Sequence, residues 1–231
     1  MMNQTIQEYT GYPSIDKPWL KYYTEEAIKS TPFQGSVYEH VLVKNQDYPE
    51  NIALQYFGKK ITYKELFQKT ETVAGALSEA GVGKGDNVIL LMSSCPELVY
   101  LLLALNKLGA VANMINPLFS EEQIKERIND TDAELLIVLD QLYDLVKGIK
   151  SSLCIKKTVV VSVSESMPVF TGLIAGRKLK KKIHYGNDVI SWSVFIAKAD
   201  GKRGETINDV DLKAEQMTRL LQKMESVIAL I

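Results

Sequence analysis

Apolar and polar positions follow two different periods along this chain, and the alternation between them predicts its secondary structure. Between residues 88 and 163, short runs that are apolar at nearly every position alternate with segments of helical spacing. The short runs predict buried strands at Val88–Met92, Ala110–Ile115, Glu134–Leu139 and Lys157–Val163. The segments between them predict helices at Pro96–Leu108, Ser120–Asp130 and Gln141–Ile149. Apolar strands separated by helices indicate an α/β fold, with a parallel sheet flanked by helices on both faces.

Two capping boxes predict helix starts before the first of these strands. In each box a Ser or Thr is followed three residues later by Glu, which lets side chain and backbone hydrogen-bond reciprocally. The pairs are Ser36 with Glu39 and Thr62 with Glu65. The first helix should run to about Asn45 and the second to Gly81. Between them, two short strands joined through Gly58 predict a β-hairpin.

The same patterns divide the chain into three regions. Residues 1–34 form an N-terminal arm, which we expect to lie on the domain through Trp19 and Tyr23. Residues 35–196 form the α/β subdomain, and residues 197–231 form a tail. Near the end of the subdomain, Ser191–Ile196 predicts a short helix that packs Trp192 and Phe195. In the tail, Leu212–Met224 has apolar residues near helical spacing.

Composition and charge limit the partners that we expect. The net charge of −1 gives no bulk field that would attract nucleic acid. The apolar runs are far shorter than the roughly 20 residues of a membrane span, and the first eight residues carry no apolar signal region. Cys95 and Cys154 are too few for a disulfide framework, and we expect reduced, buried thiols. These features predict a cytoplasmic protein.

Three candidate motifs are explained better by an ordinary structural role than by a role in ligand binding or catalysis. Gly81–Gly85 resembles part of a dinucleotide fingerprint, but it follows a helix and precedes a strand, the reverse of the required order. His40 and His184 belong to no metal-ligand cluster, so we expect no metal site. The basic run at Lys178–Lys182 is interpreted as solvated surface.

Four residues are candidates for lining a ligand cleft. Ser93 and Ser94 follow one predicted parallel strand, and Asn116 and Pro117 follow the next. Open parallel sheets bind ligands at the carboxyl ends of their strands. An ordinary strand-to-helix turn explains each pair equally well when it is taken alone.

Three segments, in order, resemble the adenylate-forming superfamily of acyl-CoA synthetases, peptide-synthetase adenylation domains and luciferases. The first, Ile61–Leu66, reads ITYKEL, and the second, Leu77–Val88, reads LSEAGVGKGDNV. The third, Asn106–Pro117, reads NKLGAVANMINP. The resemblance implies a flavodoxin-like N-terminal subdomain. It also implies a reaction in which ATP and a carboxylate give an acyl-adenylate, and a thiol such as CoA then takes the acyl group.

For an intact enzyme, the resemblance implies ATP, Mg and CoA as cofactors and a small-molecule carboxylate as substrate. The family's phosphate loop is a Ser/Thr/Gly-rich segment ending in Pro-Lys, and the 231 residues contain no Pro-Lys pair. No family catalytic residue can therefore be assigned here, and the cofactor-binding residues stay unknown. We expect an N-terminal fragment that is inactive alone, binds no cofactor by itself and can self-associate through its truncated edge. The alternative is a non-catalytic module that binds a ligand or partner.

Overall fold

The computed structural model describes residues 10–29, 34–168 and 182–199, which fall into two units, Met1–Gln34 and Gly35–Ile231. Most of the basic run and the expected helix at Leu212–Met224 lie outside the described residues. The first unit contains α1 (Pro13–Asp16), the 3-10 helix η1 (Pro18–Tyr22) and α2 (Glu25–Lys29). None of these three short helices contains a buried residue.

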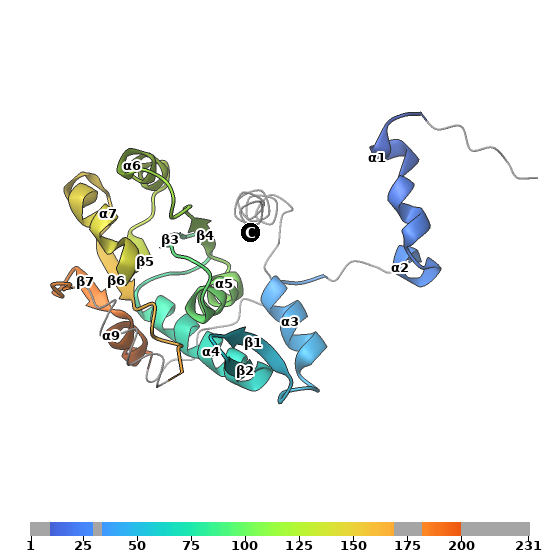
Figure 1. The fold of residues 1–231 in the computed structure, drawn as a ribbon, viewed down its shortest axis with the longest axis horizontal. Helices are drawn as coiled ribbons and strands as arrows, with labels where there is room; N and C mark the ends of the chain where they lie inside the picture. The colour runs from blue at the N-terminus through green and yellow to red at the C-terminus, as the bar shows by residue number, and fades with distance from the viewer. Residues whose placement is uncertain (1–9, 30–33, 169–181, 200–231) are drawn as a thin grey trace, which may run out of the picture. The chain divides into compact units, whose positions relative to one another are not determined.

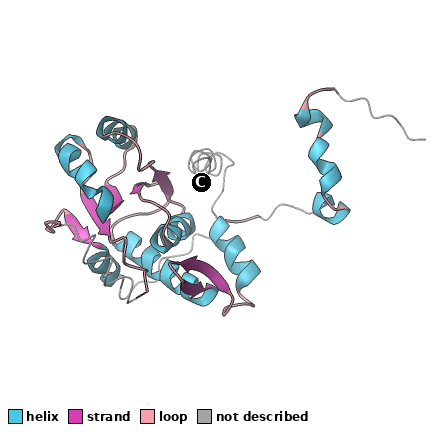
Figure 2. Ribbon diagram, viewed as in Figure 1, coloured by secondary structure: helices cyan, strands magenta, loops and turns pink. Residues whose placement is uncertain are grey.

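The second unit begins with a helix, a hairpin and a long helix, as Figures 1 and 2 show. These elements are α3 (Val37–Asn45), β1 (Ile52–Tyr56), β2 (Lys59–Thr62) and α4 (Tyr63–Glu79). Both predicted capping boxes are present, at the starts of α3 and α4. The hairpin turn is Phe57-Gly58, and both residues have positive φ angles, 46° and 84°, as a two-residue turn that matches the strand twist requires.

The remaining described residues of the second unit are built around a parallel sheet. Its strands are β3 (Asn87–Leu91), β4 (Val111–Met114), β5 (Leu135–Leu139), β6 (Lys157–Val161) and β7 (Val189–Ser191). They are arranged in the order β4-β3-β5-β6-β7, and every neighbouring pair is parallel. This is the flavodoxin-like order 2-1-3-4-5 when β3 is counted as the first strand. The predicted fold class is therefore confirmed.

Helices cover both faces of this sheet. They are α5 (Pro96–Leu108), α6 (Glu121–Asn129), α7 (Tyr143–Ile149) and α9 (Trp192–Ala197), together with the 3-10 helices η2 (Asp140–Leu142) and η3 (Lys150–Ser152). On β3, Val88 and Leu90 belong to the core that includes α4, α5 and α9, whereas Ile89 and Leu91 belong to the core under α6 and α7. The inner strands β3, β5 and β6 therefore bury alternate side chains in two separate cores, which explains their apolar runs.

The structure differs from the sequence-based expectations in four places. Strand β7 was not predicted, because its three residues are too few to show a period. The strand expected to reach Val163 ends at Val161, and the helix expected from Gln141 begins as the 3-10 turn η2. Cys95 is buried as expected, but Cys154 is exposed, so that part of the thiol prediction is wrong.

Candidate functional site

The strand order places a topological switch point between β3 and β5. From β3 the chain passes through α5 to β4 on one side, and from β5 it passes through α7 to β6 on the other side. In open α/β sheets, ligands bind outside the carboxyl ends of the strands at such a point. The loops that follow β3 and β5 are therefore the place where the fold itself favours a ligand.

The four predicted cleft residues follow β3 and β4, which are neighbours in the sheet. Ser93 and Ser94 are exposed in the loop after β3. Asn116 and Pro117 are half-buried after β4, and the Asn116 side-chain oxygen accepts a hydrogen bond from the Leu118 backbone N–H at 2.9 Å. The structure thus places Ser93 and Ser94 directly at the switch point. That all four residues line a ligand cleft stays a prediction.

Asp140 is a buried acidic residue at this edge that the sequence analysis missed. It is 8% exposed and follows β5 immediately. One carboxylate oxygen accepts a hydrogen bond from the Ser162 hydroxyl at 3.1 Å, and the other accepts one from the Val163 backbone N–H at 3.3 Å. Asp140 therefore ties the chain after β6 to the end of β5. An acidic residue that directly ends an apolar run was the signal in the sequence.

Glu97 is a second buried carboxylate that the sequence analysis missed. It lies in the first turn of α5 and is 2% exposed. Its carboxylate accepts a hydrogen bond from the Ser166 hydroxyl, 69 residues away in the chain. The Val163 carbonyl accepts a further, weaker hydrogen bond from the Tyr56 hydroxyl at 3.4 Å. Segment 162–166 is thus fastened to β5, to α5 and to the β1–β2 hairpin.

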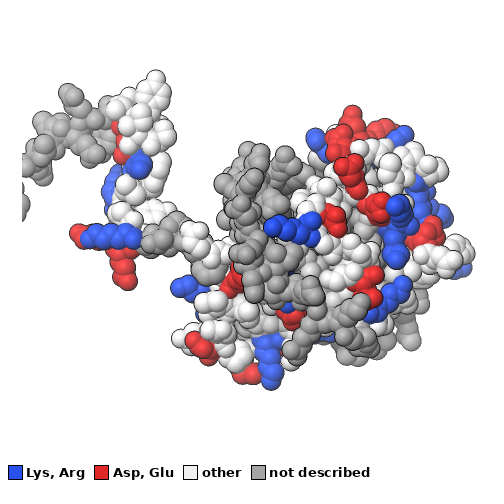
Figure 3. Space-filling view, turned by 180° about the vertical axis from the view of Figure 1, so that it is seen from behind, with Lys and Arg blue, Asp and Glu red and all other residues white. Residues whose placement is uncertain are grey.

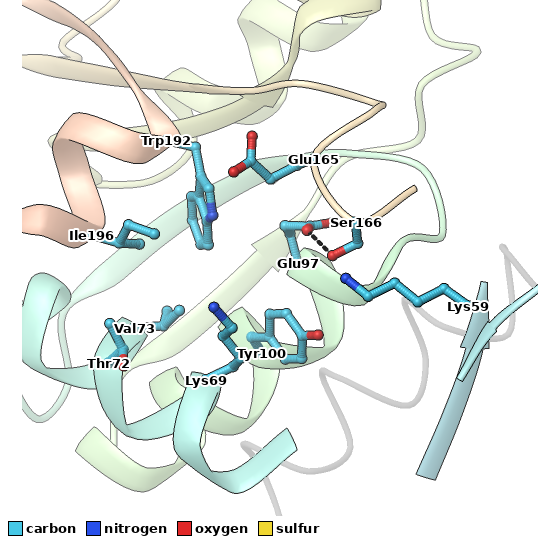
Figure 4. A pocket seen from close by; sticks show the side chains of 10 residues that line it. All are labelled: Lys59, Lys69, Thr72, Val73, Glu97, Tyr100, Glu165, Ser166, Trp192 and Ile196. Atoms are coloured by element: carbon cyan, nitrogen blue, oxygen red, sulfur yellow. Dashed lines mark hydrogen bonds between the residues drawn. The ribbon is translucent and has the colours of Figure 1, made fainter. Parts of the chain in front are cut away.

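A small pocket lies beside Glu97, and Figure 4 shows the side chains around it. Its volume is about 100 Å³. Glu97, Ser166 and the rings of Tyr100 and Trp192 form its buried part. Lys59, Lys69, Thr72 and Glu165 are exposed around it, and Val73 and Ile196 complete the lining. The four predicted cleft residues are not among those that line this pocket.

Burial and the Glu97 carboxylate shift the acidities of the groups around the pocket. Burial raises the pKa of the Cys95 thiol to about 12, and the negative charge of Glu97 contributes to this shift. The same two causes raise the pKa of Tyr100 to about 12. Partial desolvation and Glu97 raise the pKa of the Glu165 carboxyl, while Lys69 and Lys59 oppose this shift. Cys95 and Tyr100 are therefore neutral at physiological pH.

The two cysteines should consequently react very differently with alkylating reagents. Because only the thiolate is nucleophilic, iodoacetamide at pH 8 should modify the exposed Cys154 and leave the buried Cys95 intact in the folded protein. Intact mass should show one adduct, and peptide mapping should place it on Cys154. Unfolding in guanidinium is the control and should give two adducts. Rapid modification of Cys95 in the native protein would contradict the structure.

The described charged side chains outside this pocket do not indicate a binding site for another class of ligand. Figure 3 shows Lys and Arg side chains interspersed with Asp and Glu side chains on the face that it draws. Within residues 10–29, 34–168 and 182–199, no three His, Cys, Asp or Glu side chains are grouped so that they can hold a metal ion. None of the described helices combines the length and apolar character that crossing a membrane requires.

Comparison with known proteins identifies the protein family to which this chain belongs. The model of the AMP-binding enzyme family matches residues 42–213. A long-chain-fatty-acid–CoA ligase of Bacillus subtilis is 24% identical over 173 residues, which are 74% of this chain and 31% of that protein. An acetyl-coenzyme A synthetase of Rhizobium meliloti is 32% identical over 142 residues, or 53% of this chain and 22% of that protein.

Solved structures agree on the fold. An anthranilate CoA ligase in complex with anthranoyl-AMP superimposes with a TM-score of 0.59 at 21% identity, over 72% of this chain and 29% of its own. A coronafacic acid ligase from Pectobacterium brasiliense gives a TM-score of 0.58 at 19% identity, over 74% of this chain and 31% of its own. The fold is thus the α/β architecture found in these two ligases. The chain belongs to the AMP-binding enzyme family, and it spans about a third or less of the length of these relatives.

Proposed function

We propose that this chain forms the N-terminal α/β part of an AMP-forming carboxylate–CoA ligase. The observation that carries the proposal is the family match over residues 42–213, which spans the whole parallel sheet. The relatives' names, a fatty-acid–CoA ligase and an acetyl-coenzyme A synthetase, favour a carboxylate as the substrate class. In such a ligase, Ser93 and Ser94 would line the substrate-binding cleft at the switch point. Asn116 and Pro117 would line the same cleft next to them.

In the part of the chain that the structure describes, we find no set of residues that fits the ATP and magnesium that the family implies. The 231 residues contain no Pro-Lys pair, and the described part offers no cluster of acidic residues for a metal. Adenylate formation depends on positioning and neutralising the phosphates. We infer that these residues contribute the sheet, the switch-point loops and the fastened segment 162–166, and that phosphate binding needs residues outside this sequence.

This polypeptide alone should accordingly form no acyl-adenylate. The purified chain is incubated with Mg-ATP and acetate, octanoate or palmitate, and pyrophosphate release and acyl-AMP are measured by mass spectrometry. The expected result is no product above a no-enzyme blank, with a full-length CoA ligase as the positive control. Acyl-AMP in amounts proportional to the chain would refute this prediction.

Isothermal titration of Mg-ATP into the same preparation separates two alternatives. An absence of binding heat agrees with a nucleotide site that needs residues outside this sequence. Saturable binding without turnover would instead favour the alternative function, a non-catalytic ligand-binding module.

A further inference from the structure

The pocket beside Glu97 has an unusual distribution of charge. Within the described residues, the Glu97 carboxylate accepts a hydrogen bond from the Ser166 hydroxyl, which is a neutral group. No described Lys, Arg or His nitrogen lies within 4 Å of its carboxylate oxygens. A carboxylate that is 2% exposed usually has a cationic partner, because desolvating an unpaired charge is costly.

Two ammonium groups and a second carboxylate stand around the same pocket. Figure 4 shows the Lys69 side chain extending from α4 beside Tyr100 toward Trp192, and the Lys59 side chain extending from β2 toward Ser166. In the described part of the chain, neither lysine forms an ion pair within 4 Å. Together with Glu97 and Glu165, the four charges sum to zero. A zwitterionic ligand has no net charge but carries one positive and one negative group. Its positive group would pair with a carboxylate of the pocket, and its negative group with the lysine ammonium groups.

The aromatic walls and the small volume of the pocket further restrict the class of ligand that it can bind. The rings of Trp192 and Tyr100 line it, and aromatic faces attract ammonium groups. A volume of about 100 Å³ is well below the roughly 300–1,000 Å³ of pockets for drug-sized ligands. It is too small to enclose a nucleotide, CoA or a fatty acyl chain, and it has room for only a few non-hydrogen atoms.

We propose that this pocket binds a small amino-acid-like zwitterion of about the size of glycine or β-alanine. The ammonium group lies inside against Glu97, Ser166 and the aromatic rings. The carboxylate faces outward, toward Lys69 and Lys59. None of the four predicted cleft residues lines this pocket, and the proposal does not depend on the ligase function proposed above.

Fluorescence of Trp192 provides a direct test. The chain has two tryptophans, Trp19 and Trp192, and only Trp192 lines the pocket. In a Trp19→Phe background, titration with glycine and β-alanine at constant ionic strength should give a saturable change in emission. Methylamine and acetate, which each carry one half of the charge pair, should bind at least about tenfold more weakly. Equal responses to acetate or methylamine, or no saturable response, would overturn the proposal.

Matched lysine variants locate the binding site. Lys69→Met removes a rim ammonium and should weaken glycine binding at least about tenfold. Lys64→Met is the control, because Lys64 also lies on α4 but is exposed, pairs with Glu50 and does not line the pocket. Glu97→Gln should abolish binding, and because that variant risks misfolding, the comparison of Lys69→Met with Lys64→Met decides. Equal losses in the two lysine variants would overturn the proposal.

Discussion

Replacing Glu71 with leucine should lower the free energy of unfolding by about 3 kcal/mol, because it leaves the buried Lys107 ammonium without its partner. Lys107 Nζ lies 2.6 Å and 2.5 Å from the two carboxylate oxygens of Glu71. The Lys107 side chain is only 5% exposed, whereas that of Glu71 is 32% exposed, which puts the loss at the lower end for a buried pair. Chemical denaturation followed by circular dichroism measures the change.

A third group strengthens the expectation. The Tyr38 hydroxyl donates to a Glu71 carboxylate oxygen at 2.5 Å, and Lys107 Nζ lies 5.3 Å from the centre of the Tyr38 ring. Burial and the neighbouring Glu71 raise the pKa of Tyr38 well above its usual value, so its hydroxyl stays a donor. The three residues join α3, α4 and α5, and Glu71→Leu removes the acceptor that the other two share.

A second ion pair of the same charge type serves as the control. Lys64 Nζ and Glu50 are 3.9 Å apart with side chains 59% and 76% exposed, so Glu50→Leu should change stability by no more than about 1 kcal/mol. Combining Glu71→Leu with Lys107→Met should recover part of the loss, since no buried charge is then left alone. If Glu71→Leu cost no more than Glu50→Leu, the network would contribute little.

The parts of the fold that the sequence predicted correctly are those set by local chemistry. Thr62 and Glu65 lie three residues apart, so their capping box can be recognised without any knowledge of the fold. The strand Leu135–Leu139 is buried at all five positions, and its unbroken apolar run reflects the helices on both faces of the sheet. The capping box depends only on contacts between residues close in sequence, and the strand is buried in the same way at every position. Both elements can therefore be predicted from the local sequence.

The parts that the sequence did not predict depend on contacts between distant residues. Glu97 and Ser166 are 69 residues apart, and Tyr38 and Glu71 are 33 residues apart. Nothing near Glu97 in the sequence distinguishes it from an exposed helix-start glutamate, which is the commoner place for that residue. Only the folded chain brings segment 162–166 to the start of α5 and makes Glu97 a buried group.

Phe195→Ala should lower the free energy of unfolding by about 3–4 kcal/mol, the usual cost of truncating a fully buried aromatic side chain. Phe195 is 1% exposed on α9, and its ring centre lies 5.8 Å from that of Trp192. The matched control is the neighbouring Val194, which is 49% exposed, so Val194→Ala should change stability by about 0.5 kcal/mol or less.

This comparison also tests whether the sheet extends to β7. Helix α9 follows β7 directly, and Phe195 shares a core with Ile190 of β7 and Val159 of β6. If β7 and α9 fold cooperatively with the rest of the sheet, Phe195→Ala lowers the single unfolding transition that circular dichroism and Trp192 fluorescence both report. A loss below about 1 kcal/mol, or a separate early transition seen only by Trp192, would show that the cooperative sheet ends at β6. The pocket beside Glu97 would then lose the wall that Trp192 supplies.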